Sequence, residues 1–221
     1  MNYLLNLHGT SFLLSMAVVS LVDLLVYFKW KSIRFFLLHV FVNSVVVLSS
    51  TQEMITVLGN PLRSFSNNNV IPMNIVLVFH VYHMLVYSDL KPVDWIHHLV
   101  MMGTLILPFL DPAAISVTNA IMFFTCGLPG LIDYSLMAAV KSGKIDLLTE
   151  KQVNTLLNTW IRGPGILACA YVCYLRYRYC MYGNLLFVVL STAALYWNAQ
   201  YFTKAVAFSY GEKREARKTK K

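Results

Sequence analysis

Long apolar runs that carry almost no charge are the feature that most limits what this chain can fold into. They are separated by short polar stretches and lie at about residues 10–28, 33–57, 71–88, 95–110, 113–140, 155–178 and 183–208. An α-helix needs about 20 mostly apolar residues to cross a bilayer. Charged residues make up 13% of the chain, where a soluble domain carries roughly a quarter. The sequence therefore predicts an all-α, multi-pass membrane protein, a bundle of about seven transmembrane helices.

Lysine and arginine residues in the loops predict the orientation of these helices. If the N-terminus lies outside, thirteen of them fall in cytosolic segments and three in outer loops, in keeping with the usual cytosolic excess of positive charge. We therefore expect a lumenal or outer N-terminus and a cytosolic C-terminus. The first apolar run has no basic segment before it and no cleavage site, so we expect it to remain as a span.

The chain is expected to form one transmembrane domain, residues 1–210, followed by a basic tail, residues 211–221, with the sequence GEKREARKTKK. Such a tail could bind nucleic acid. Directly after an apolar helix, however, it is typical of a cytosolic topology anchor that attracts anionic lipid. We therefore expect membrane lipids and no nucleic acid among the partners. A homo-oligomer and a role as a subunit of a membrane complex both stay open.

Two of the predicted helices contain glycine–proline pairs, in GLPG at residues 127–130 and in RGPG at residues 162–165. Proline removes a backbone donor and interrupts a helix. Interrupted helices are tolerated inside a bilayer where they line a cavity or pack within protein. The sequence therefore predicts a cavity near these two interruptions.

Histidines gather in two neighbouring helices. His80 and His83 are three residues apart and share one helix face, with Tyr87 four residues further on. His97 and His98 begin the next helix and point about 100° apart, so only one of them can aim directly at a given partner. A tight loop makes the two helices antiparallel neighbours. We expect three or four histidines to meet in a polar chamber on the cytosolic side.

Further polar groups in the apolar segments complete a candidate site. Arg162 begins one interruption, and an arginine beside a broken backbone is suited to binding an anion. A neutral imidazole takes up a proton near physiological pH, and a carboxylate such as Asp133 can orient it. The candidate catalytic residues are His97, His98, Asp133 and His83. The candidate substrate-binding residues are Arg162, His80, Tyr87 and Tyr134.

Other interpretations of these polar residues stay open. The pattern HxxH followed by HH is similar to the histidine boxes of membrane di-iron enzymes, but a third box is missing, and we assign no metal ligands. Each histidine could instead form a hydrogen bond between helices. Asp23 is expected to pair with another helix, and Glu53 is expected to end the second helix early. A transporter is a further alternative, although no inverted repeat is visible.

Four segments, in this order, resemble the TLC-domain family of membrane proteins. They are FHVYHMLVYSDLKPVDWIHHLVMM, LPGLIDYSLMAAVKSGKI, NTWIRGPGI and LYWNAQYFTKAVAF. The resemblance covers about residues 10–210. It implies a six-helix core, to which this chain adds one helix, and a setting in the endoplasmic reticulum or another endomembrane.

The resemblance also implies a function in lipid metabolism or homeostasis. Ceramide synthases of this family pair two histidines with two aspartates. Here Asp133 and Tyr134 match that segment, Gly130 stands where the first acid is expected, and His83 stands where many members carry an acid. Acyl transfer with acyl-CoA as co-substrate is one expectation, and no other cofactor is implied. A non-catalytic lipid sensor or structural subunit is the alternative.

Overall fold

The computed structural model describes residues 2–63, 69–87, 95, 98–100, 102–103, 112–181 and 184–219, without the side chains of residues 2–8 and 112. In this part of the chain every regular element is a helix. The longer α-helices are α1 (Asn2–Trp30), α2 (Arg34–Gly59), α3 (Ile71–Val86), α6 (Leu128–Lys141), α8 (Gly163–Arg178) and α9 (Leu185–Lys218). The shorter elements are η1 (Lys31–Ile33), η3 (Pro112–Ala114), α5 (Ile115–Met122), η4 (Phe123–Gly127), α7 (Leu147–Leu157) and η5 (Asn158–Arg162).

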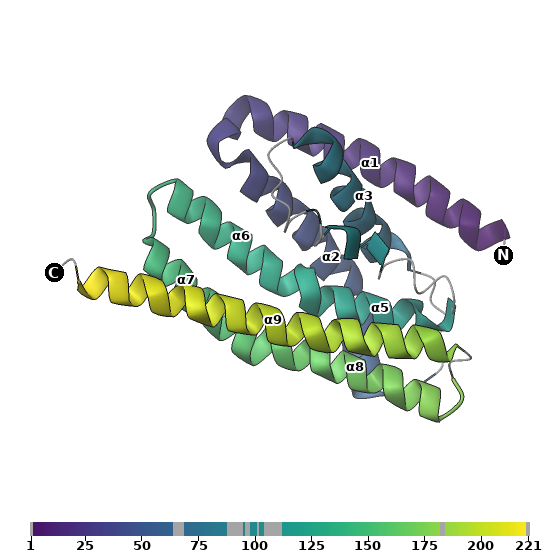
Figure 1. Ribbon diagram of the computed structural model, residues 1–221. Coiled ribbons are helices and arrows are strands. Elements are labelled where there is room, and N and C mark those ends of the chain that lie inside the picture. Colours follow the sequence, from purple (N-terminus) through teal and green to yellow (C-terminus); the bar gives the residue numbers. More distant parts are fainter. Residues whose placement is uncertain are drawn as a thin grey trace.

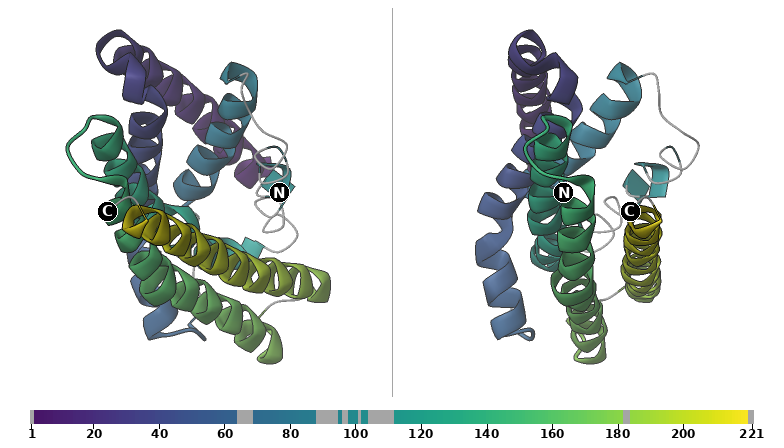
Figure 2. Two further views of the ribbon diagram at one scale, coloured as in Figure 1. Left: turned by 60° about the vertical axis from the view of Figure 1, so that its left-hand side comes forward. Right: turned by 90° about the vertical axis from the view of Figure 1, so that its left-hand side faces the viewer.

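The helices are arranged around α2 and α5. Helix α2 packs against α1, α3, α5 and α6, and the chain reverses between α1 and α2 at η1 (Figure 1). Helices α8 and α9 run antiparallel along each other, and α7 packs on both α6 and α9 (Figures 1 and 2). All eight residues of α5 are buried, which is the behaviour of a helix enclosed by others.

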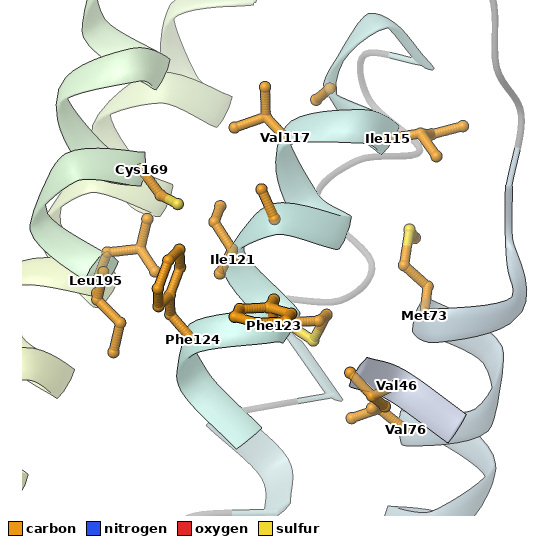
Figure 3. Packing of buried hydrophobic residues seen from close by; sticks show 14 of the residues in the cluster. Val46, Met73, Val76, Ile115, Val117, Ile121, Phe123, Phe124, Cys169 and Leu195 are labelled. Atoms are coloured by element: carbon orange, nitrogen blue, oxygen red, sulfur yellow. The ribbon is translucent and has the colours of Figure 1, made fainter. Parts of the chain in front are cut away.

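The buried core runs from α3 through α5 and η4 to α8 and α9. Figure 3 shows Met73 of α3 beside Ile115 of α5, and Phe124 of η4 between Ile121 and Leu195. By contrast, α1 exposes large apolar side chains, among them Leu13 at 70% and Phe28 at 76%. Apolar surface on this scale is unusual on a soluble monomer and is expected where lipid covers the protein.

Three stretches of helix are long and apolar enough to cross a membrane. Among the described residues they are Gly9–Gly59, which contains α2 and α1 from Gly9 onward, and the stretches Ile115–Lys141 and Leu185–Lys218. Helix α3 is apolar but shorter. These lengths and compositions indicate a membrane protein, as the sequence predicted.

Several predicted boundaries were wrong. The polar stretch before the predicted helix at 155–178 is itself helical from Leu147, because the Asp146 side chain caps α7 by accepting from the backbone of Leu148 and Thr149 at 2.9 and 3.1 Å. Helix α9 continues through the basic tail to Lys218. Glu53 does not end α2, since it is buried inside that helix and accepts a hydrogen bond from Asn69 at 3.0 Å.

Both predicted interruptions are present, in a form that keeps the helices continuous. The turn before Pro129 is the π-helical segment η4, and the turn before Pro164 is the π-helical segment η5. In each case proline occupies the first turn of the next helix, where its missing N–H is harmless. In a π-helical turn the backbone hydrogen bonds span five residues in place of four, so the helix is locally wider. Such turns are frequent at functional sites.

Candidate functional site: a polar chamber

A cavity of about 570 Å³ lies among α2, α3, η4, α6, α7, η5 and α9. Its volume falls within the roughly 300–1,000 Å³ of small-molecule sites. Apolar side chains such as Val42, Val76 and Phe79 form part of its lining. The rest is polar and comes from residues far apart in the sequence. We call this cavity the chamber.

Four histidines form one side of the lining, which we call the histidine wall: His39, His80, His83 and His98. Their rings are in contact, with centroids 4.7 Å apart for His39 and His83, 5.6 Å for His83 and His98, and 5.0 Å for His80 and His98. All four are buried. The prediction that histidines of neighbouring helices meet is confirmed for His80, His83 and His98.

Hydrogen bonding differs among these histidines. The Nδ1 atoms of His39 and His80 lie 2.7 Å from the carbonyl oxygens of Phe35 and Val76, one helical turn earlier. His83 is 2% exposed, and neither of its ring nitrogens has a hydrogen-bond partner among the described residues. A buried polar group of this kind costs free energy unless something satisfies it. His83 is therefore the histidine that most needs a ligand or water.

Aromatic rings and an ion pair hold the histidine wall in place. Tyr134 stacks on His39 at a centroid distance of 3.8 Å, and Tyr87 lies edge-on to His83 at 4.8 Å. The Tyr87 hydroxyl donates to Asp23 at 3.4 Å, and Arg34 forms a bidentate ion pair with the same carboxylate. Asp23 was predicted to pair with another helix, and it does so with α2 and α3.

Arg162 lies on the other polar part of the chamber, which we call the arginine wall: Asn154, Asn158, Arg162 and Asn198. The Arg162 guanidinium donates to the Thr125 carbonyl at 3.0 Å and to the Asn158 and Asn198 side-chain oxygens at 3.4 and 2.8 Å. Arg162 is in η5 and Thr125 is in η4. The two π-helical turns are thus joined directly by one arginine.

Asp133 lines the chamber from α6 and adjoins Glu150 of α7. Glu150 is fully buried and forms an ion pair with Lys151 at 3.1 Å. Asp133 was predicted to orient a histidine. Among the described residues it has no hydrogen bond to one, and one of its oxygens is buried without any hydrogen-bond partner. Among neighbouring charged groups, the carboxyl group of Glu150 affects it most.

The structure brings most of the predicted site residues together. The chamber is lined by His80, His83, Tyr87, His98, Asp133, Tyr134 and Arg162. His97 lies outside the described residues. His98 reaches His83 and His80.

Sequence reasoning did not assign several lining residues to the site. His39 stood alone in its helix, and only the packing of α2 against α3 brings it to His83. Asn158 and Asn198 carried no signal beyond their polarity in apolar surroundings, although Asn158 lies four residues before Arg162 on the same helical face. Glu150 lies in one of the short polar stretches between apolar runs, which the sequence did not place in the site.

No group of three histidine, cysteine, aspartate or glutamate side chains in the described part of the chain is placed to hold a metal ion. Comparison with models of known protein families, with curated proteins and with solved structures found no match to this chain. The resemblance to the TLC-domain family therefore depends on the four quoted segments alone.

Proposed function

We propose that this chain is a seven-span membrane protein of TLC type that binds a lipid or fatty-acyl molecule in the chamber. The chamber is the observation that carries the proposal, because its volume suits a small molecule and its lining combines apolar side chains with two polar walls. The four TLC-like segments contribute most of that lining. The proposed setting is the endoplasmic reticulum or another endomembrane.

The proposed topology has a lumenal N-terminus and a cytosolic C-terminus. Two observations support a chamber that opens toward the cytosol. Lys141 and Lys144 flank the turn between α6 and α7, and loop lysines favour the cytosolic side. Asp133 lines the chamber from α6 and Asn154 from α7, and Asn158 lines it from η5, which directly continues α7.

Lipid analysis of the purified protein tests this proposal. Val206 lines the chamber from α9, so Val206→Trp should exclude a ligand that co-purifies with the unchanged chain. Val189→Trp is the matched control, because Val189 lies on the same helix and is 53% exposed. Mass spectrometry should find a bound lipid or acyl species in the unchanged chain and in Val189→Trp but not in Val206→Trp. Equal lipid in all three proteins would reject a ligand-binding chamber.

We further propose acyl transfer as the reaction, with acyl-CoA as co-substrate. The unsatisfied ring nitrogens of His83 favour it, because a neutral imidazole without a partner is free to accept a proton. An amine or hydroxyl would attack the thioester carbonyl, forming a C–N or C–O bond while the C–S bond breaks. The proton of the nucleophile would pass to an imidazole nitrogen of the histidine wall and then to the departing thiolate.

Release of free CoA with lipid amine or alcohol acceptors tests this reaction. His83→Leu should abolish turnover while the thermal unfolding temperature stays close to that of the unchanged chain. Bound lipid without any turnover would instead support the alternative, a non-catalytic lipid sensor or a subunit of a membrane complex.

A further inference from the structure

Arg162 is a partly buried cation that forms no ion pair among the described residues. Its three hydrogen-bond acceptors, on Thr125, Asn158 and Asn198, are all neutral. No carboxylate oxygen of the described residues, including those of Asp133, lies within 4.0 Å of its nitrogens. Asp133 interacts with this charge only from beyond that distance, and a cation that is partly withdrawn from water is stabilised by a close anion. This arrangement indicates that an anion binds beside Arg162.

The hydrogen-bond geometry limits the kind of anion. A guanidinium has five N–H donors, and the contacts above use three of them, which leaves two for a ligand. The two remaining N–H groups, one on each Nη atom, can donate to the two oxygens of a carboxylate. Arg162 is also the only lysine or arginine among the described residues that line the chamber. A single positive charge balances a carboxylate better than a phosphate monoester, which carries close to two negative charges.

A second cavity continues from this point. A narrow cleft of about 50 Å³ lies between α5 and α9 and is lined mainly by apolar side chains, among them Ile121, Met122, Phe187 and Leu195. Figure 3 shows Ile121 and Leu195 on these facing helices. Thr125 and Asn198 line both the cleft and the chamber. They are also the two residues to which Arg162 donates its shortest hydrogen bonds, so the guanidinium lies where the two cavities meet.

We infer that Arg162 binds the carboxylate of a single-chain fatty acid, and that the acyl chain runs past Thr125 and Asn198 into the cleft between α5 and α9. This inference rests on the proposed function, and it specifies the ligand as anionic and single-chained. A second acyl chain has no place in the cleft, which has room for part of one chain only.

Binding of defined fatty acids to the purified full-length protein tests the inference. The probes are palmitate, octanoate, a lysophosphatidate with a 16-carbon chain, the uncharged alcohol hexadecanol, and acetate or inorganic phosphate alone. Palmitate should bind at least about tenfold more tightly than the uncharged alcohol, since a charge-assisted bidentate contact is lost with the alcohol. Acetate and inorganic phosphate should not bind measurably, because they lack the chain. Tighter binding of lysophosphatidate than of palmitate would overturn the assignment of a carboxylate.

Four variants separate the charge from the chain. Arg162→Gln should weaken palmitate binding about tenfold or more and remove its preference over the alcohol, and Arg162→Lys should restore part of that preference. Ala194 lines the cleft, so Ala194→Phe should weaken palmitate binding but not octanoate binding. Ala193→Phe is the matched control, because Ala193 is the adjacent, exposed residue. Unfolding temperatures show whether each variant is folded.

The outcomes distinguish this inference from the proposed function. If Val206→Trp excludes lipid while Arg162→Gln and Ala194→Phe bind palmitate like the unchanged chain, the chamber binds lipid but the inference is wrong. If none of these changes affects bound lipid, both are wrong. Should Arg162→Gln unfold, the chain-length effect of Ala194→Phe still decides the matter, and an equal loss of palmitate and octanoate there would overturn the inference.

Discussion

The histidine wall and the arginine wall line one chamber, yet they are built in opposite ways. In the arginine wall each polar side chain is tied to another: Asn158 donates to Asn154 at 2.6 Å and accepts from Arg162, which in turn reaches Asn198. In the histidine wall the rings meet mainly through their faces and edges, and His83 has no hydrogen bond within the described part of the chain. A hydrogen-bonded wall is pre-organised, whereas His83 in the wall of stacked rings keeps both ring nitrogens for proton exchange or a ligand.

The difference also shows where each wall gets its rigidity. The histidine wall is supported from behind by Asp23 of α1, which accepts from Arg34, Tyr82 and Tyr87 and so joins α1 to α2 and α3. The arginine wall is supported within its own hydrogen bonds and by the close approach of α8 to η4. Four predictions follow this difference, ordered by the size of the expected effect.

The largest effect is expected from removing the support of the histidine wall. Asp23 is 2% exposed, and Asp23→Ala would leave the Arg34 guanidinium without its carboxylate. We expect a loss of about 3 kcal/mol of stability, measured as thermal unfolding in detergent by tryptophan fluorescence. The control is Glu215→Ala, which removes an exposed ion pair with Lys218 and should leave the unfolding temperature unchanged. Equal unfolding temperatures for the two variants would show that Asp23 does not support the wall.

The next effect is expected behind the arginine wall, at Gly165. A Cβ atom there would lie 2.2 Å from the Phe124 ring, so α8 would have to move away from η4. Gly165→Ala should cost about 2–3 kcal/mol through overpacking. Gly211→Ala is the control, because nothing lies within 4 Å of that position in α9. It should be neutral or stabilise by about 0.5–1 kcal/mol. If Gly165→Ala is as stable as the unchanged chain, α8 and η4 pack less closely than the structure shows.

A smaller effect compares the two walls directly. Asn158→Leu removes a donor and an acceptor from a connected network and should cost about 2 kcal/mol. His83→Leu removes a polar group that lacks a hydrogen bond in the described structure, so the stability should change by less than about 1 kcal/mol. Denaturant or thermal unfolding in the same detergent measures both. A large loss for His83→Leu would indicate that His83 has a stabilising partner, such as bound water or lipid.

The smallest effect concerns the start of α7, which carries Asn154 of the arginine wall. Hydrogen bonds, first of all from the Thr149 side chain, hold the pKa of the Asp146 carboxyl below its usual range. The stabilisation of α7 by this cap is therefore complete above the pKa of aspartate in the unfolded chain, about 3.9. It is lost as the pH falls through the lower pKa of Asp146 in the folded protein. The unfolding temperature should fall below about pH 4 in the unchanged chain, and Asp146→Asn should flatten that dependence. An identical pH profile for the two proteins would contradict this role of the cap.

Sequence-based predictions succeeded where the residues lie close together in the sequence and missed contacts between residues far apart. His80 and His83 share a helix face by spacing alone, and the short connection to the next helix brought His98 to them. His39 and Asn198 reach the chamber only because α2 packs on α3 and because α9 lies beside η5, contacts that no local pattern specifies. Asp133 was expected beside a histidine. The packing of α6 against α7 places it beside Glu150 instead.

The sequence by itself determined that the apolar segments within the described residues are helical, where two of them are interrupted, and that polar groups stand inside them. These properties follow from hydrophobicity, proline stereochemistry and residue spacing, all of which act within a few turns of one helix. Only the tertiary structure decided that the interruptions are π-helical turns joined by Arg162, that Asp23 pairs with Arg34, and that a chamber and a cleft meet at Thr125 and Asn198. Those features depend on side chains more than ten residues apart in the sequence, and only the packing of the helices brings them together.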